Sequence, residues 1–336
     1  MSQSDQQQVE YDEYLSRKHA EMVTPPEMID SFVQKATGEK VKDQKHLMKG
    51  EANEVYNVTT TSGEEVIVRV SHEEFEAFGK EEWAIEHCQQ VGVPVPKVLL
   101  VENDNTNDKF RSFCILEKLK GNPLMQIVKD GSITQQDRDA VIRETGRILS
   151  KVHSIKTQKF GWLSDGGVGH NDTWAEYVLR RARPDAIERV KEVANKINLD
   201  PSFIDRAAEI LSQYQELYDQ VEPRLLHGDL GFEHIFVDGT TITGIIDWGN
   251  ATSGDPLHDF AWWNFFHKDD ETGLLLMEGY ENKEIFKGDF ALKLNLYKLY
   301  LSLDFLNYYD RGNFPPGLEI ARVNLLKGLN YFNHEV

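Results

Sequence analysis

Cysteine is scarce in this sequence: only Cys88 and Cys114 occur among 336 residues. They form no CxxC pair, and the chain has no HExxH motif or other tight cluster of cysteine and histidine, so a structural zinc site is not expected. Two separate thiols, one in a stretch of helical pattern and one in a stretch of extended pattern, are typical of a reducing compartment. The scarcity of cysteine therefore favours a cytoplasmic protein.

Long apolar runs are also missing. No run approaches the roughly 20 residues that a membrane-spanning helix requires. Residues 1–14 are polar and acidic, unlike a secretory signal peptide. We therefore expect no membrane partner.

Basic residues are outnumbered. The chain has 37 Lys and Arg against 56 Asp and Glu, which gives a formal net charge of −19. A surface of that sign repels phosphate backbones, so nucleic acid is not an expected partner. It would attract a cationic small molecule, although an acidic surface can equally serve only to keep a protein soluble.

The apolar residues, 40% of the chain, are enough for one large core or two lobes. Residues 24–38 have the pattern of a helix, with prolines in the first turn and a glycine at the end. Extended segments follow, interrupted by a turn at Thr61-Ser62-Gly63 and by one helical segment. We expect strands at residues 45–48, 54–60, 65–70, 97–102 and 111–117, and a helix at 75–90.

From Gly121 onward the apolar residues recur at helical spacing. One strand pair, at residues 235–246, interrupts the helices expected at 137–155, 174–183, 185–197, 202–221 and from 259 to the end. The sequence thus predicts an α+β protein with a small antiparallel-sheet lobe, residues 1–117, and a larger, mainly helical lobe, residues 118–336. Pockets favour such a junction.

The most informative stretch begins with His227-Gly228-Asp229. After it, two extended segments flank Asp238-Gly239, a strong signal for a hairpin turn. Such a hairpin brings His234, before its first strand, close to Asp247, after its second, with Asp229 on the loop that leads in. Phosphoryl transfer needs one carboxylate for the proton of the attacking hydroxyl and another oxygen ligand for the magnesium that bridges the phosphates. The spacing is that of a kinase catalytic loop.

Three motifs, His227–Asp229, Ile245–Trp248 and Gly254–Ala261, resemble those of the aminoglycoside phosphotransferase family. The resemblance covers about residues 25–330. The family includes macrolide and hygromycin kinases and several metabolite kinases, all with a protein-kinase-like fold. The resemblance implies a bilobal α+β fold and a nucleotide-binding first lobe. It also implies transfer of the terminal phosphate of ATP or GTP, with Mg²⁺, to a hydroxyl.

The resemblance also implies roles for single residues. In the second lobe, Asp229 matches the catalytic base and Asp247 the metal-binding acid of the family. Asp259 matches a buried acid that braces the catalytic loop from below, and His153 matches a buried core histidine.

In the first lobe, the resemblance places nucleotide contacts. Arg69 falls where the family has its phosphate-contacting Lys or Arg, and Glu81 matches the helix acid that pairs with that cation. Glu117 and Leu119 lie in the segment that resembles the hinge, whose backbone would hydrogen-bond the base of the nucleotide.

Two departures from the family pattern stand out. His234 occupies the position of the usual metal-ligand Asn, and an imidazole nitrogen is a poorer partner for Mg²⁺ than an amide oxygen. Macrolide phosphotransferases share this histidine. The loop at residues 49–54 has a single glycine and no GxGxxG, so Gly50 and Asn53 are the candidates for phosphate contact, with a plain surface turn as the alternative.

Three further features remain open. The aromatic cluster at residues 261–266 is expected in the core, with a cation–π role at a pocket edge as the alternative. Residues 166–174 could face the substrate or form a surface connection. The acidic patches at 269–271 and 304–310 could face an amine-bearing ligand or solvent.

The leading functional hypothesis is an aminoglycoside-type antibiotic kinase, because the acidic balance suits a polycationic sugar. A macrolide kinase, a kinase of an amino-alcohol or sugar metabolite, and a nucleotide-binding pseudokinase are the alternatives.

Overall fold

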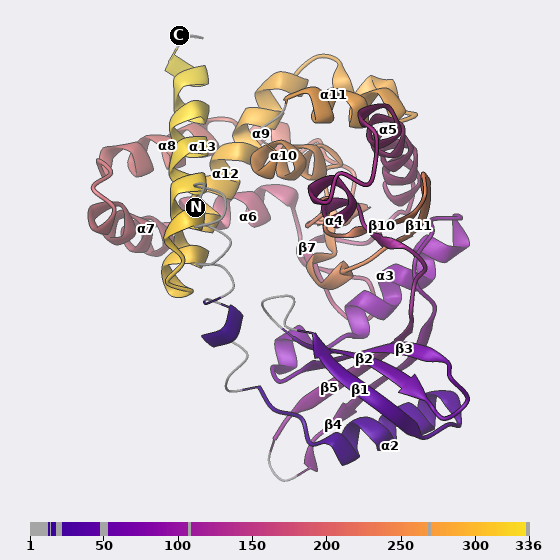
Figure 1. The fold of residues 1–336 in the computed structure, drawn as a ribbon. Helices are drawn as coiled ribbons and strands as arrows, with labels where there is room; N and C mark the ends of the chain where they lie inside the picture. The colour runs from indigo at the N-terminus through magenta and orange to yellow at the C-terminus, as the bar shows by residue number, and fades with distance from the viewer. Residues whose placement is uncertain are drawn as a thin grey trace.

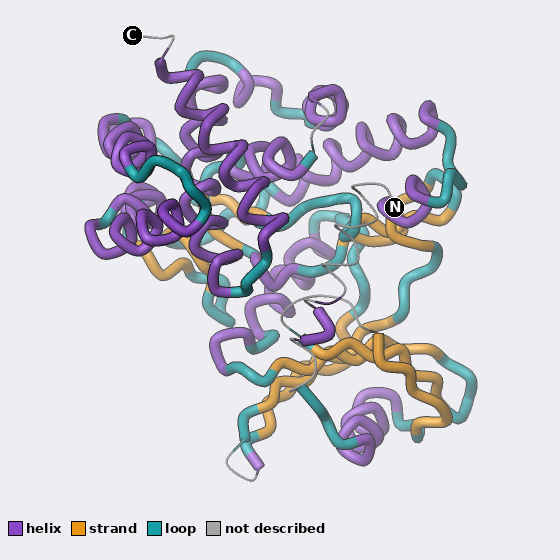
Figure 2. The backbone as a smooth tube through the Cα atoms, turned by 60° about the vertical axis from the view of Figure 1, so that its left-hand side comes forward, coloured by secondary structure: helices purple, strands orange, loops and turns teal. Residues whose placement is uncertain are grey.

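The computed structural model describes residues 13, 15–17, 22–47, 53–106, 109–267 and 270–333. The chain forms a sheet-rich lobe and a larger helical lobe (Figure 1). Figure 2 shows the strand-rich part below the helix-rich part in a second view. Within the described ranges, no helix combines the length and the apolar character needed to cross a membrane.

The first lobe is built on a five-stranded antiparallel sheet in the order β1-β2-β3-β5-β4. Its side chains alternate between a buried and a less buried face, as in β2, because successive residues of a strand point to opposite sides. Ile29 and Val33 of α2 pack on one face beside Val58 and Phe113. The elements are α2 (Pro26–Thr37), β1 (Val41–Leu47), β2 (Glu54–Thr60), β3 (Glu65–Ser71), β4 (Val98–Asp104) and β5 (Arg111–Glu117).

The other face of the sheet receives α3 (Gly79–Gln90), whose Ala84, Ile85 and Cys88 pack beside Cys114 of β5. The sequence predicts a helix from residue 75, but residues 74–76 form a separate 3₁₀ turn. The helix starts later because Phe78 turns inward, where it is only 2% exposed.

The second lobe is mainly helical. Helix α5, for example, has a buried apolar face and starts at Thr134, whose Oγ1 accepts a hydrogen bond from the backbone N–H of Asp137 at 3.1 Å. The helices are α4 (Leu124–Lys129), α5 (Gln135–Val152), α6 (Trp174–Leu179), α7 (Pro184–Lys196), α8 (Ser202–Gln213), α9 (Gln215–Tyr218), α10 (Leu257–Phe266), α11 (Asp270–Gly279), α12 (Phe290–Arg311) and α13 (Pro315–Asn333).

The expectation of a single strand pair in this lobe is wrong. Besides the hairpin of β10 (Ile235–Asp238) and β11 (Thr241–Ile245), to which β6 (Asn122–Pro123) adds a third strand, there is a four-stranded sheet in the order β8-β7-β12-β9. Its strands have only three or four residues each, too few to show a period of two in the sequence. They are β7 (Phe160–Leu163), β8 (Gly169–Asn171), β9 (Arg224–Leu226) and β12 (Thr252–Gly254).

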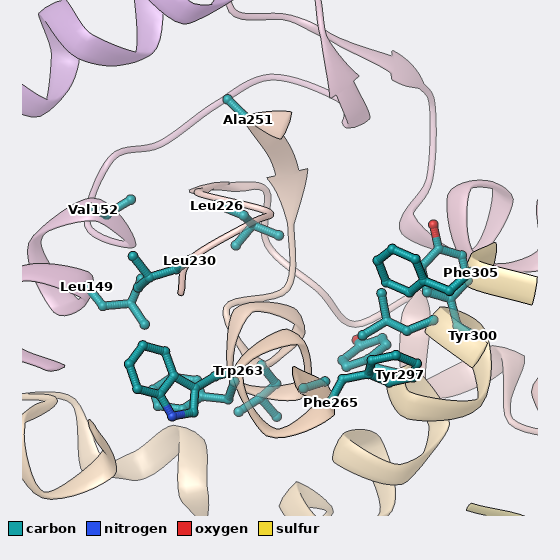
Figure 3. Close-up of a cluster of buried hydrophobic side chains, with 14 of the residues drawn as sticks. Leu149, Val152, Leu226, Leu230, Ala251, Trp263, Phe265, Tyr297, Tyr300 and Phe305 are labelled. Carbon is teal, nitrogen blue, oxygen red and sulfur yellow. The ribbon is translucent and has the colours of Figure 1, made fainter. Parts of the chain in front are cut away.

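The core of the second lobe reaches the loop between β9 and β10. Leu230, 3% exposed, anchors that loop in the cluster that contains Leu226, Trp263 and Tyr297 (Figure 3). Trp263 and Phe265 are buried, as expected for this aromatic run, whereas Trp262 and Phe266 are half-buried. The loop therefore rests on a packed support rather than on solvent.

Candidate active site

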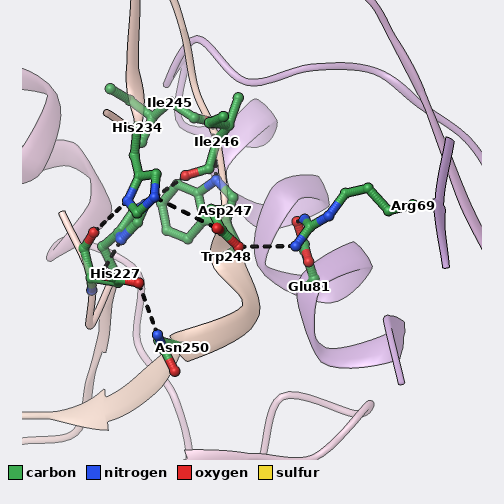
Figure 4. Close-up of polar contacts among 10 residues, drawn as sticks. Arg69, Glu81, His227, His234, Ile245, Ile246, Asp247, Trp248 and Asn250 are labelled. Carbon is green, nitrogen blue, oxygen red and sulfur yellow. Dashed lines mark hydrogen bonds and ion pairs between the residues drawn. The ribbon is translucent and has the colours of Figure 1, made fainter. Parts of the chain in front are cut away.

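Asp229 lies in the loop before the hairpin and Asp247 lies just after the hairpin, and the two residues belong to one cluster, as the sequence indicates. β9 leads into the loop of residues 227–234, and β11 leads to Asp247. His234 contacts both residues: its Nδ1 donates to the backbone carbonyl of Asp229 at 2.6 Å, and its Nε2 lies 3.6 Å from Oδ2 of Asp247 (Figure 4).

The carboxyl of Asp229 is oriented by Asn250, which donates from Nδ2 to Oδ2 at 3.0 Å. Burial, helped by the nearby charges of Asp247 and Glu233 and opposed by His234, raises the pKa of Asp229 to about 7. A carboxylate with a pKa near the working pH is suited to accept a proton in a transition state. Asn250 is not among the residues predicted from the sequence, although its place three residues after Asp247 is a possible signal.

Asp247 has left-handed backbone angles, φ 65° and ψ 63°, which are uncommon for a residue other than glycine and which often occur at functional sites. Its Oδ1 accepts a hydrogen bond from Nη2 of Arg69 at 3.0 Å. Burial alone would raise the pKa of Asp247, but the charges of Arg69 and His234 hold it at about 2. The group is therefore ionised at neutral pH and suited to hold a cation.

Arg69 joins the two lobes at the site. Nη1 of Arg69, on β3, forms an ion pair with Oε1 of Glu81, on α3, while Nη2 reaches Asp247 in the other lobe (Figure 4). Glu81 is 2% exposed, so the pair is nearly sealed from water. The structure thus brings Arg69, Glu81, Asp247, His234 and Asp229 together.

Asp259 of α10 holds the loop from behind, where the sequence analysis expects a brace. Its two carboxylate oxygens accept hydrogen bonds from the backbone N–H groups of His227 and Gly228, each at 2.9 Å, and from Nε2 of His153 at 3.0 Å. Gly228 has φ +77°, and an added Cβ would lie 2.2 Å from the carbonyl oxygen of Asn250. Only glycine fits this turn without displacing Asn250.

The ring of His227 has a structural role that the sequence analysis did not assign. Nε2 donates to the carbonyl of Ile246 at 3.0 Å, and Nδ1 accepts from the backbone N–H of Asp229 at 3.2 Å. The ring therefore ties the residue before Asp247 to the loop that carries Asp229. Burial lowers the pKa of His227 to about 4, so the ring is neutral at pH 7, as this donor–acceptor pairing requires.

The remaining predicted contacts lie at the lobe junction or outside the described ranges. Glu117 ends β5 and its N–H donates to the carbonyl of Lys97 at 3.0 Å, while the side chain of Leu119 lies against Gly244. Asn53 immediately precedes β2. Gly50 falls outside the residues that the structure describes. The nucleotide roles of these four residues stay predictions.

The donor set at Asp247 fits a magnesium ion better than a metal that needs a closed protein cage. In the described ranges, no group of three or more His, Cys, Asp or Glu could hold a metal. Mg²⁺ commonly binds one or two carboxylates and takes its other ligands from water and phosphate. Asp247 fits that pattern, whereas the contacts of His234 are a hydrogen bond to Asp229 and an ion pair to Asp247. The ligand role of His234 stays a prediction.

Two other features are a pocket and the acidic patches. The pocket has a volume of about 640 Å³, and His153, Tyr280 and Asp255 are among its lining residues. Of the acidic patches, residue 269 is outside the described ranges, and Asp304 forms ion pairs with the guanidinium groups of Arg180 and Arg181.

Comparisons with known proteins place this site in a family. Residues 43–283 match the model of the phosphotransferase enzyme family APH. The chain is 22% identical over 242 residues to hygromycin-B 4-O-kinase of Escherichia coli, which covers 70% of this chain and 67% of that kinase. It is 25% identical over 179 residues to acyl-CoA dehydrogenase family member 11 of Homo sapiens, covering 53% of this chain but only 21% of that longer protein.

Solved structures have the same fold. A thermostable mutant of aminoglycoside phosphotransferase APH(4)-Ia, in a ternary complex with ADP and hygromycin B, superimposes with a TM-score of 0.71 at 21% identity, over 90% of this chain and 98% of that one. A putative fructosamine-3-kinase from Thermobifida fusca gives 0.63 at 17% identity, over 89% and 98%.

The family match covers well over half of the chain and includes Arg69, Glu81, Asp229, His234 and Asp247 of the candidate site. The predictions of a bilobal protein-kinase-like fold, of membership in the aminoglycoside phosphotransferase family and of a phosphotransferase acting on an alcohol group are thereby confirmed. The chain belongs to the phosphotransferase enzyme family.

Proposed function

We propose that the protein transfers the terminal phosphate of ATP or GTP to a hydroxyl of a cationic small molecule, with an aminoglycoside-type antibiotic as the leading candidate. The observation that carries this proposal is the position of Asp229: its carboxyl, with a pKa of about 7, is oriented by Asn250 in the same cluster as Asp247. A base and a cation-binding acid in this arrangement are what phosphoryl transfer to a hydroxyl requires.

In this proposal, each of three residues has its own role. Asp229 accepts or orients the proton of the acceptor hydroxyl, Asp247 binds Mg²⁺, and Arg69 contacts the phosphates from the other lobe. When bound, Mg²⁺ neutralises charge on the phosphate oxygens. Glu81 holds Arg69 in place through their buried ion pair, so the cation does not have to be ordered when the nucleotide enters.

Charge supports a cationic acceptor. Glu233 is exposed, and its charge contributes to the raised pKa values of both Asp229 and His234, so it lies near the catalytic carboxyl. A carboxylate at that place could pair with an ammonium group of the acceptor. The net charge of −19 acts in the same direction at longer range.

A macrolide acceptor is the second candidate, because His234 occupies the position where macrolide phosphotransferases also have a histidine. A metabolite such as a sugar or amino-alcohol is the third. A pseudokinase is the alternative outside catalysis, motivated by the same His234 substitution and the single glycine at residues 49–54.

The test is a transfer assay with purified protein, Mg²⁺ and either ATP or GTP. The acceptor panel contains hygromycin B, other aminoglycosides, macrolides, amino-alcohols and sugars, and Asp229→Ala serves as the inactive control. A phosphorylated aminoglycoside detected by mass spectrometry supports the leading proposal, and a phosphorylated macrolide or metabolite selects an alternative. Thermal stabilisation by Mg²⁺ and nucleotide without transfer to any acceptor would indicate a pseudokinase.

A further inference from the structure

The turn between β7 and β8 lies against the first turn and a half of α3, in the other lobe. Gly167 lies so close to Trp83 that an added Cβ would be 2.0 Å from Cε2 of the indole. Gly79, the first residue of α3, lies equally close to Asp165, where an added Cβ would be 2.3 Å from Cγ. Each contact therefore depends on a glycine, one on each side of the interface.

A third contact extends this interface. Nζ of Lys80 lies 5.2 Å from the centroid of the Trp162 ring, within the range of a cation–π interaction. Trp162 belongs to β7 and Lys80 to α3, so the hairpin touches the helix with its strand as well as with its turn.

The turn itself is ordered by its own hydrogen bonds. Ser164 N–H donates to the carbonyl of Val168 at 2.9 Å, and Gly167 N–H donates to the carbonyl of Ser164 at 2.9 Å. The backbone N–H of Val168 adds a bond to Oγ of Ser164 at 3.3 Å. The surface that meets Trp83 is thus a closed turn and not a loose loop.

The hairpin is also joined to both ends of the catalytic segment, defined here as residues 227–250. β7 pairs with β12 through Thr252 and Trp162, and β12 pairs with β9. β9 runs directly into His227, and β12 begins two residues after Asn250. One small sheet therefore connects the strands that flank the catalytic segment with the turn that contacts α3.

We propose that this hairpin is an interlobe clamp, in which the Gly167–Trp83 contact sets the position of α3 relative to the catalytic loop. Because α3 carries Glu81, the clamp positions Arg69 and its contact with Asp247 without touching the nucleotide. Gly167 and Trp83 are positioning residues in this scheme. Of the two readouts in the test below, nucleotide binding rests on the proposed function, whereas hydrogen exchange in α3 does not.

The test variant is Gly167→Ala, which adds one methyl group against Trp83. Gly166→Ala is the matched control, because the nearest atom to its added Cβ is Oγ of Ser164 at 4.0 Å. Gly38→Ala controls for backbone strain, since Gly38 has φ +79°, close to the +72° of Gly167, and open space around it. Hydrogen–deuterium exchange of peptides covering residues 79–90 and the Kd of Mg²⁺·AMP-PNP by calorimetry are the two readouts.

We expect Gly167→Ala to speed exchange in α3 and to weaken nucleotide binding about tenfold, a typical coupling between sites. Both controls should match the wild type, and the melting temperature shows whether each variant is folded. Trp83→Ala should speed exchange in the same way by removing the contact from the other side, which covers the case of an unfolded Gly167→Ala. In the Trp83→Ala background the added methyl has space, so a further effect of Gly167→Ala should be small.

Unchanged exchange in α3 for both Gly167→Ala and Trp83→Ala would overturn the clamp, as would equal effects from the Gly38→Ala control. Failure of the proposed function gives a different result: either the wild type binds no nucleotide, or it binds nucleotide without transferring phosphate, and in both cases the exchange measurement still reports on α3.

Discussion

Asn250 donates a hydrogen bond from Nδ2 to Oδ2 of Asp229 at 3.0 Å, and this bond sets the direction of the proposed base. Asn250→Ala removes the bond and leaves the carboxyl free to rotate. We expect kcat to fall by about 10- to 100-fold with little change in KM for the nucleotide, because an interaction that matters mainly in the transition state is lost. Steady-state kinetics with the acceptor found in the panel provide the measurement. Asn295→Ala on α12, where Nδ2 of Asn295 donates to the carbonyl of Ala291 in the same helix, is the control.

A second prediction separates the two polar groups beside Asp247. Asp229→Ala should lose nearly all transfer, about a thousandfold or more, because general-base removal and lost positioning act together. His234→Asn should retain substantial turnover, since an amide oxygen can serve at the metal position. Single-turnover rates at saturating Mg²⁺ measure both. An active Asp229→Ala enzyme would contradict the assignment of the base.

Some of these elements and residues can be predicted from the sequence, and others cannot. Residues 54–60 and 111–117 are predicted to the residue as β2 and β5, and the hairpin after Asp229 follows from Asp238-Gly239 and two apolar segments. β7, β9 and β12 are too short to leave a periodic signal, so the sequence does not predict the sheet that supports the loop of the proposed base. Asn250 is missed for a related reason: its bond to Asp229 spans 21 positions and depends on that sheet.

The buried ion pair between Arg69 and Glu81 leads to a third prediction. Arg69→Met leaves Glu81 and Asp247 without their shared cation, and an unpaired buried charge costs about 3–5 kcal/mol of unfolding free energy. In Arg69→Met/Glu81→Met the buried pair is replaced by apolar groups, so we expect part of that loss to be recovered. Urea unfolding followed by tryptophan fluorescence measures both variants. A double variant less stable than Arg69→Met would show that the pair is not the origin of the loss.

The last prediction concerns His258, which is 3% exposed and whose two ring nitrogens have no hydrogen-bond partner. Its ring lies among those of Trp174, Tyr297 and Tyr300. Burial lowers its pKa to about 4 from an ordinary value of 6.5, with Arg180 acting in the same direction and Asp255, Asp259 and Asp304 opposing it.

The direction in which pH changes the stability follows from proton linkage. Between pH 6.5 and pH 4 the unfolded chain binds a proton at His258 that the folded chain does not, so unfolding becomes easier as the pH falls through this window. The full effect corresponds to about 3 kcal/mol. His258→Phe removes the titrating group and its two unpartnered nitrogens, and it places a phenyl ring among the aromatic neighbours. We therefore expect a shallower loss of stability below pH 6.5 and equal or greater stability at pH 7. Urea unfolding at several pH values tests this, with the exposed His170→Gln as the control; a pH slope as steep as that of the wild type would exclude His258 as its source.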